Sequence, residues 1–429
     1  MAVLWISCLA VAGMIALVLV KPAVKIGKVS VSTFWLPPAL AAVILLATGL
    51  LPIAEAGAGL FADSAVNPVK ILILFFSMTL LSVFLDEAGF FRSLAAAVLR
   101  HSGTSQKKLF LLLYLAVSVL TVFTSNDIIV LTFTPFLCYF AKNAEIDPVP
   151  YLFCEFVAAN TWSMALIIGN PTNIYLAAET DFAGYFRVML LPTLFAGAAS
   201  FLVLWLLFGK KLNTPMRGKP ERLPPEDPVP VVLGLVALAG AIVLMALSSY
   251  LPLPDMWLVA LVAFLGLYAV AAVVQLTRKK GLSLLGRSLR RAPFDVAPFV
   301  LSMFILVLAL NRSGVVKQLA ELLSRANPVF SFGIASFLAC NLINNIPMSV
   351  LFSSVVSAAG GGESALFAAV IGSNIGAFLT PIGALAGIMW MGMLKTHGVR
   401  LSFGKFTAVG AAVAIPALFA ALAGLLLAC

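Results

Sequence analysis

The chain of 429 residues is 62% hydrophobic and only 10% charged, and its mean hydropathy is +1.10. These values exclude an ordinary soluble domain and place the protein among polytopic membrane proteins. The net charge of +10 does not require a nucleic-acid partner, because an excess of Lys and Arg in cytoplasmic loops gives the same sign. The five cysteines show no metal-type spacing, so we expect neither a metal site nor disulfides.

The first apolar run, at 2–20, carries its lysines after it, which favours a spanning helix over a cleaved signal peptide. Apolar runs at 34–53 and 70–87 predict two more spanning helices, and a basic amphipathic stretch follows at 89–108. Asp86 and Glu87 are expected at the cytoplasmic end of the third helix, where interfacial carboxylates are common.

A polar tetrapeptide, TSND at 124–127, interrupts the apolar segment at 109–140. The runs on either side are shorter than the roughly 20 residues that cross a bilayer, so the segment predicts a re-entrant helical hairpin with a polar tip. An ionisable group at membrane depth is costly unless it faces a cavity or a partner, which makes Asp127 a candidate functional residue. The alternative is that Asp127 only caps the helix beginning at Ile128.

The first half closes with a long apolar segment at 151–178, which GNPTN at 169–173 breaks, and with a helix at 184–208. Glu155 is expected near a helix start on the cytoplasmic side, where a carboxylate complements the helix dipole. Residues 209–229 are charged and rich in proline, which indicates a linker.

After the linker the same order of elements recurs, so we predict a first repeat at 1–208 and a second at 230–429. The second repeat is predicted to contain helices at 231–250, 256–276 and 295–311, an amphipathic stretch at 312–325, a hairpin at 328–358, a broken helix at 365–391 and a last helix at 403–428.

The distribution of charge predicts the topology. If each hairpin enters and leaves on one side, 22 of the 27 Lys and Arg residues fall on one face, which is then cytoplasmic. Both termini are predicted outside the cell inner (plasma) membrane. The two hairpins open on opposite faces, so the fold class is an all-α polytopic membrane protein with two inverted-topology repeats. Interrupted helices at matching positions of such repeats indicate a transporter's binding site near the bilayer midplane.

Amides and hydroxyls dominate the tips and the breaks. The candidate substrate-binding residues are Ser125, Asn126, Asn170, Thr172, Asn173, Asn344, Asn345, Ser373, Asn374 and Thr380. Asp127 is the predicted proton-coupling residue. Neither Lys nor Arg lies in a tip or a break, which favours a neutral solute, although helix N-termini can also hold an anion. We expect no catalytic residues, because an intramembrane enzyme needs a catalytic pair at depth and only Asp127 is predicted deep.

Four motifs carry a resemblance to a known family: LDEAGFF at 85–91, ND at 126–127 with TP at 134–135, NNIP at 344–347 and TPIG at 380–383. In this order they resemble the arsenite permeases, the membrane subunit of arsenical efflux pumps, within the ion transporter superfamily. The resemblance covers nearly the whole chain. Two features depart from it, because Ile128 and Ile129 replace small residues after the first tip and GNPTN is closer to the superfamily's general type.

The resemblance implies efflux of arsenite or antimonite by proton antiport, without a cofactor, in a scaffold that is often dimeric. It leaves open a soluble ATPase subunit on the basic cytoplasmic face, since the chain has no Gly-rich phosphate loop of its own. The alternatives within the superfamily are a sodium-coupled carboxylate or anion carrier and a sodium–proton antiporter.

Overall fold

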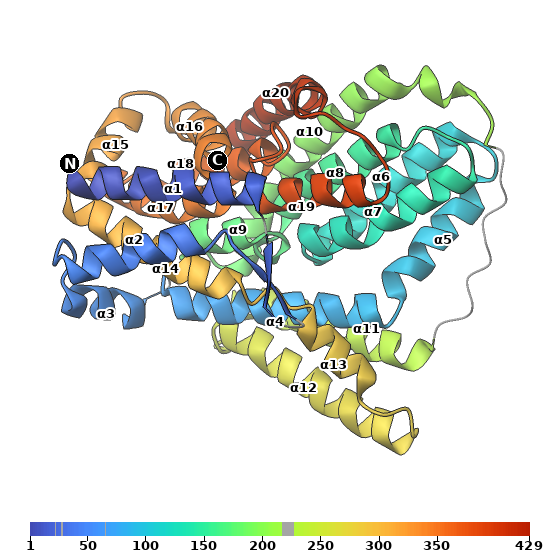
Figure 1. The fold of residues 1–429 in the computed structure, drawn as a ribbon, viewed down its shortest axis with the longest axis horizontal. Coiled ribbons are helices and arrows are strands. Elements are labelled where there is room, and N and C mark those ends of the chain that lie inside the picture. The colour runs from blue at the N-terminus through green and yellow to red at the C-terminus, as the bar shows by residue number, and fades with distance from the viewer. Residues whose placement is uncertain (22, 27–28, 65, 217–226) are drawn as a thin grey trace.

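The computed structural model describes residues 1–21, 23–26, 29–64, 66–216 and 227–429. This part of the chain is nearly all helical, and most of its helices run along the long axis of the molecule (Figure 1). Six helices are long and apolar enough to cross a membrane, and a bent helix pair forms a seventh candidate. The prediction of a helical polytopic membrane protein is confirmed.

One small sheet departs from the all-α prediction. Helix α1 (Ala2–Val20) is followed by two antiparallel strands, β1 (Ala23–Ile26) and β2 (Val29–Ser32). The alternation of Val and Ser in β2 is typical of a strand. The backbone N–H of Ser32 donates to the Asp295 carboxylate at 3.0 Å, so the sheet is attached to the start of a helix in the second half.

The prediction of a single spanning helix at 34–53 is wrong. The structure has a helix of only 12 residues, α2 (Leu36–Ala47), and a second short helix, α3 (Ile53–Phe61). Between them Gly49 has φ +71°, a conformation that glycine adopts without steric cost, and Pro52 precedes α3. These two residues separate the helices.

The rest of the first half follows the predicted order. Its elements are α4 (Pro68–Glu87), α5 (Phe90–Ser102), α6 (Gln106–Phe123), α7 (Asn126–Asn143), α8 (Val149–Trp162), the 3-10 helices η1 (Ser163–Ala165) and η2 (Ile167–Gly169), α9 (Pro171–Leu176) and α10 (Phe182–Phe208). The predicted linker begins with a 3-10 turn, η3 (Lys211–Asn213), and its residues 217–226 lie outside the described residues.

The second half contains one short helix that the sequence did not predict, α13. Its elements are α11 (Pro228–Ser248), α12 (Met256–Thr277), α13 (Ser283–Arg290), α14 (Val296–Arg312), α15 (Val315–Leu323), α16 (Pro328–Ile343), α17 (Asn345–Ala359), α18 (Gly362–Gly376), α19 (Leu385–Thr396) and α20 (Phe403–Ala428).

The opening helices of each half pack on the other half. Helix α2 packs against α14, while α11 and α12 pack against α4 (Figure 1). We call α1–α4 and α11–α14 the scaffold helices. A second group, α6–α10 and α16–α20, forms the inner bundle, in which α16 packs on α18 and α10 packs on α20.

Two corners connect the scaffold helices to the inner bundle. Helix α5 begins after Gly89, at φ +88°, and α15 begins after Gly314, at φ +80°, where α14 and α15 meet at 79°. Positive φ at each corner favours glycine. The first corner is held by Arg291, the residue that directly follows α13, which forms ion pairs with Asp86 at 2.7 Å and Glu87 at 2.8 Å. Both carboxylates therefore join the two halves.

Candidate functional site

The first broken helix unwinds where the sequence supplies a proline and a capping amide. Helix α8 ends at Trp162, two 3-10 turns follow, and α9 begins at Pro171. Proline suits the first helical position, because a backbone N–H there would have no acceptor within the helix and its absence costs nothing. The side-chain oxygen of Asn170 accepts from the Thr172 N–H at 3.1 Å and caps α9.

Asn374 of the second half occupies the centre of this break. Its side-chain oxygen lies 3.0 Å from the Ser163 hydroxyl and accepts from the Asn170 amide at 3.0 Å. Its own amide donates to the Asn173 side-chain oxygen at 2.7 Å. All four residues are buried. The two halves of the chain therefore meet through side-chain amides inside the inner bundle.

The first tip is attached to the same group of side chains. The Asn126 amide donates to the Asn160 side-chain oxygen at 3.1 Å, and the Ser163 hydroxyl lies 2.9 Å from the Asn160 carbonyl oxygen. The six connected residues, which we call the amide network, are Asn126, Asn160, Ser163, Asn170, Asn173 and Asn374.

The second tip bonds to the second break. The Asn341 side-chain oxygen accepts from the Thr380 N–H at 3.1 Å and from its hydroxyl at 2.6 Å. The Asn344 amide donates to the Ile382 carbonyl at 3.1 Å, and the Asn345 N–H donates to the Gly383 carbonyl at 3.0 Å. Hydrogen bonds thus join the tip to the break in this half.

Several buried oxygen atoms of these segments have no hydrogen-bond partner among the described residues. They belong to side chains at or beside the tips and breaks: Asn126, Thr161, Thr172, Asn345 and Ser373. Helix α9, which carries Thr172, packs on α17, which carries Asn345. A buried polar atom without a partner costs roughly 1–3 kcal/mol, so such a group is suited to a hydroxylic solute, water or a cation.

Asp127 lies in the first turn of α7, beside the amide network but not bonded to it. The residue is partly exposed, and its carboxylate has no hydrogen-bond or ion-pair partner within the described part of the chain. Ser125 precedes it, is buried, and makes no side-chain bond to cap α7.

Sequence reasoning missed three residues of these clusters, Asn160, Ser163 and Asn341. Asn160 and Ser163 lie nine and six residues before Gly169 of GNPTN, and Asn341 lies in the last turn of α16, three residues before Asn344. A polar side chain in an apolar helix, one or two turns from a tip or a break, was the available signal.

The prediction for Glu155 is wrong. Helix α8 begins at Val149, so Glu155 lies almost two turns inside it and is fully buried. The Thr134 hydroxyl lies 3.0 and 3.1 Å from its two carboxyl oxygens. The Trp390 indole N–H faces the same carboxyl without completing a hydrogen bond. Glu155 therefore joins α7 to α8 within the inner bundle.

A polytopic helical fold whose interrupted helices enclose a network of uncharged polar side chains defines a membrane transporter. Comparison with known proteins identifies the family. The model of the family described as citrate transporter matches residues 9–372, and the chain belongs to this family of ion transporters. The prediction of an arsenite permease-like ion transporter is confirmed by the relatives.

The arsenical pump membrane protein of Yersinia enterocolitica is 27% identical over 375 residues, which are 82% of this chain and 85% of that protein. The arsenical pump membrane protein of Escherichia coli strain K12 is 28% identical over 378 residues, with the same coverage. Among solved structures, the YdaH transporter of Alcanivorax borkumensis, reported to have an unusual topology, superposes with a TM-score of 0.59. It is 14% identical, the match covers 99% of this chain and 96% of that one, and the likeness shows the fold alone.

Proposed function

We propose that this transporter exports arsenite or antimonite in exchange for protons, by alternating access across the cell inner membrane. The observation that carries the proposal is the buried bridge from Asn374 to Asn170 and Asn173, which joins two interrupted helices of different halves. Broken helices of two repeats meet in this way around the substrate of secondary transporters. The names of the two bacterial relatives support the choice of substrate.

The chemistry of the amide network suits a neutral hydroxylic solute. Arsenite at neutral pH is As(OH)₃, whose hydroxyls both donate and accept hydrogen bonds. Side-chain amides and hydroxyls bind in both directions. The hydrogen bonds that hold the network come from uncharged side chains, so none of these bonds offers a cationic group to a multiply charged anion. Asp127, one residue from Asn126, exchanges the coupled proton in this proposal.

The second candidate function is a sodium-coupled carboxylate carrier. Two observations favour it: the family model is described as a citrate transporter, and helices α7 and α17 begin at the two tips. The free N–H groups at a helix N-terminus bind carboxylates, while unpaired oxygen atoms suit Na⁺.

The variant Asn374→Ala tests the proposed site. In an arsenite-sensitive bacterium that lacks its own efflux system, we expect this variant to lose about tenfold or more of the tolerance that the native chain confers, because four side-chain hydrogen bonds disappear at once. Asn143→Ala, at an exposed position, is the matched control and should retain full tolerance. Equal amounts of both variants in the membrane are required. Unchanged tolerance with Asn374→Ala would refute the assignment of the site.

A further inference from the structure

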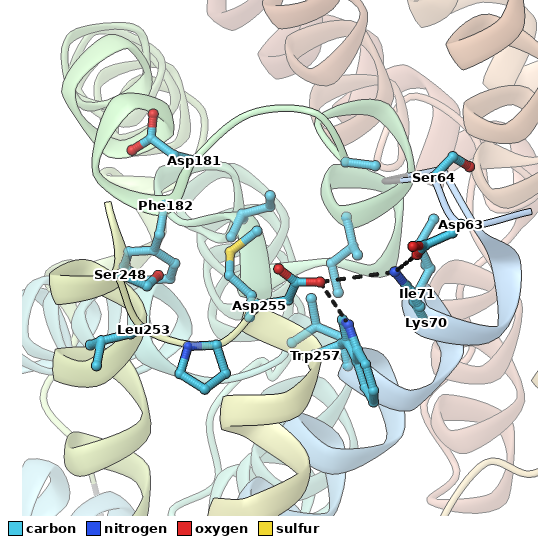
Figure 2. A pocket seen from close by; sticks show the side chains of 16 residues that line it. Asp63, Ser64, Lys70, Ile71, Asp181, Phe182, Ser248, Leu253, Asp255 and Trp257 are labelled. Carbon is cyan, nitrogen blue, oxygen red and sulfur yellow. Dashed lines mark hydrogen bonds and ion pairs between the residues drawn. The ribbon is translucent and has the colours of Figure 1, made fainter. Parts of the chain in front are cut away.

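A pocket of about 400 Å³ opens between the scaffold helices and the inner bundle (Figure 2). Its walls come from the loop before α4, the corner between α9 and α10, and the loop between α11 and α12. By the charge count of the loops, all three segments lie on the face opposite the basic loops, which is the predicted outer face.

Charged side chains line one wall of this pocket. Lys70 bonds to the Asp63 carboxylate at 2.6 Å and lies 3.9 Å from the Asp255 carboxylate, which also accepts from the Trp257 indole at 3.1 Å. In Figure 2, dashed lines join Asp255 to both Lys70 and Trp257. Asp63 and Asp255 are 93% and 71% exposed, and such open ion pairs contribute little to stability.

The pocket carries a net negative charge. Besides Asp63 and Asp255, it is lined by Asp181, which caps α10 from the opposite wall by accepting from the Gly184 N–H at 2.8 Å. Hydrogen bonding from Ser249 and then from Gly184 lowers the pKa of Asp181, and the Lys70 side chain lowers the pKa of Asp63. Both remain ionised at neutral pH, so Lys70 offsets only part of the charge.

A line of side chains leads from this pocket to the first tip. Ile71 and Leu74 of α4 line the pocket, and the next residues on the same helix face, Phe75, Met78, Thr79 and Ser82, line a second void. Ile174 of α9 lines both. The second void is about 10 Å³, room for about one water molecule.

Ser125 lies at the inner end of this line. It is 8% exposed, lines the second void, and its hydroxyl has no partner among the described residues. It precedes Asn126 of the amide network. The line therefore connects the outer pocket to the candidate substrate site through a constriction that must widen when solute passes.

We propose that the pocket is the outer vestibule of the transport path, and that its acidic lining admits cations and neutral solutes in preference to anions. This inference rests on the proposed transport function but not on arsenite as the substrate. Lys70 acts as a specificity-determining residue, because it is the cation that limits the negative charge at the mouth.

Cysteine labelling of the full chain in intact cells tests the vestibule without any transport measurement. The probe is Ser248→Cys, at a pocket-lining position, with the exposed Cys8 and Cys429 changed to Ser. Two membrane-impermeant methanethiosulfonates of similar size, one cationic and one anionic, are applied from outside. We expect labelling of intact cells and a faster reaction with the cationic reagent.

Charge variants then identify the groups responsible. Asp255→Asn should lower the ratio of cationic to anionic labelling rates by about threefold or more, and Lys70→Gln should raise it by a similar factor, because one unit charge acts across several ångströms. Glu321→Gln, an exposed acid on the same predicted face and outside the pocket, is the control and should leave the ratio unchanged. An unchanged ratio with Asp255→Asn would overturn the acidic-vestibule inference.

A second probe, Ser125→Cys, tests the route. It should react with the cationic reagent from outside, more slowly than Ser248→Cys, because the constriction lies between them. Reaction of either cysteine only after the cells are permeabilised would overturn the assignment of this pocket as the outer mouth. Loss of arsenite tolerance plays no part in these results, so a carboxylate carrier with the same vestibule would give the same labelling.

Discussion

Asn374 illustrates how a buried polar residue is accommodated at the centre of this transporter. Its oxygen lies within hydrogen-bond distance of two donors, and its amide donates both to Asn173 and to the Val370 carbonyl at 2.9 Å. A buried amide left without partners costs roughly 1–3 kcal/mol, whereas a satisfied network fixes its members in one arrangement. A bound solute would therefore replace hydrogen bonds that these same side chains now make to one another.

Asp127 contrasts with Asn374, because it has no partner in the described chain. Asp127→Asn keeps the size of the side chain and removes its charge. We expect proton-driven flux to fall about tenfold or more while the melting temperature stays nearly unchanged, since no bond is lost. Radiolabelled arsenite uptake into everted vesicles measures the flux.

The matched control for Asp127→Asn is Asp147→Asn. The Asp147 carboxylate accepts from the Val149 N–H at 3.0 Å at the start of α8, and asparagine caps a helix equally well. Proton-driven flux should therefore be retained in the control. Full flux in Asp127→Asn would show that the coupled proton is carried elsewhere.

At the scale of elements, close approach of α16 and α18 positions Asn374. A Cβ added to Gly372 of α18 would collide with the Ser336 hydroxyl and the Gly333 carbonyl of α16, and would lie 2.7 Å from the Phe337 nitrogen. Only glycine allows the two helices to pack at this distance. The position of the amide network in the inner bundle thus depends on a residue outside it.

Gly372→Ala should lower the free energy of unfolding by about 1–3 kcal/mol, because the added methyl forces the two helices apart. Gly392→Ala in α19 is the control, since nothing lies within 4 Å of the added Cβ, and it should be neutral or slightly stabilising. Thermal melting of the detergent-solubilised variants makes the comparison. Equal melting temperatures would mean that α16 and α18 do not pack as closely as described.

The ends of α11 and α12 are joined by Asp227. Its carboxylate accepts from Lys280 at 2.6 Å and from Arg278 at 2.8 Å. These contacts, chiefly the hydrogen bond from Lys280, lower the pKa of Asp227 to about 2. A depressed folded-state pKa means that the stabilisation is complete above the unfolded value of about 4 and is lost as the pH falls through about 2.

Asp227→Asn should therefore destabilise the protein by less than about 1 kcal/mol at pH 7, because the pairs are largely solvent-exposed. The difference from the native chain should shrink as the pH is lowered from 4 towards 2. Melting temperatures of both proteins across this range provide the measurement. A difference that grows on acidification would contradict the assigned ion pairs.

Much of the element order could be predicted, because polar tips and Gly/Pro breaks interrupt long apolar runs. TSND and GNPTN predict the interruptions that the structure has before α7 and α9. Contacts between distant residues could not be predicted. Asn374 and Asn173 are 201 positions apart, and the burial of Glu155 depends on how α7 packs on α8. The local sequence pattern gives no information on the contact between Asn374 and Asn173 or on the burial of Glu155.

At the scale of the whole molecule, the two halves have a similar order of elements, and the opening helices of each half pack against the other half. In the proposed alternating-access cycle, we expect the inner bundle to move against the scaffold helices, with α5 and α15 as the connections. The predicted inversion of the two repeats would place the tips on opposite sides of one site, which alternating access requires.

The most direct test of the central claim uses purified protein in liposomes with labelled arsenite outside. An acidic interior should drive arsenite accumulation, a sodium gradient should not, and Asn374→Ala should abolish the accumulation. Sodium-driven accumulation of citrate, with no movement of arsenite under either gradient, would contradict the account.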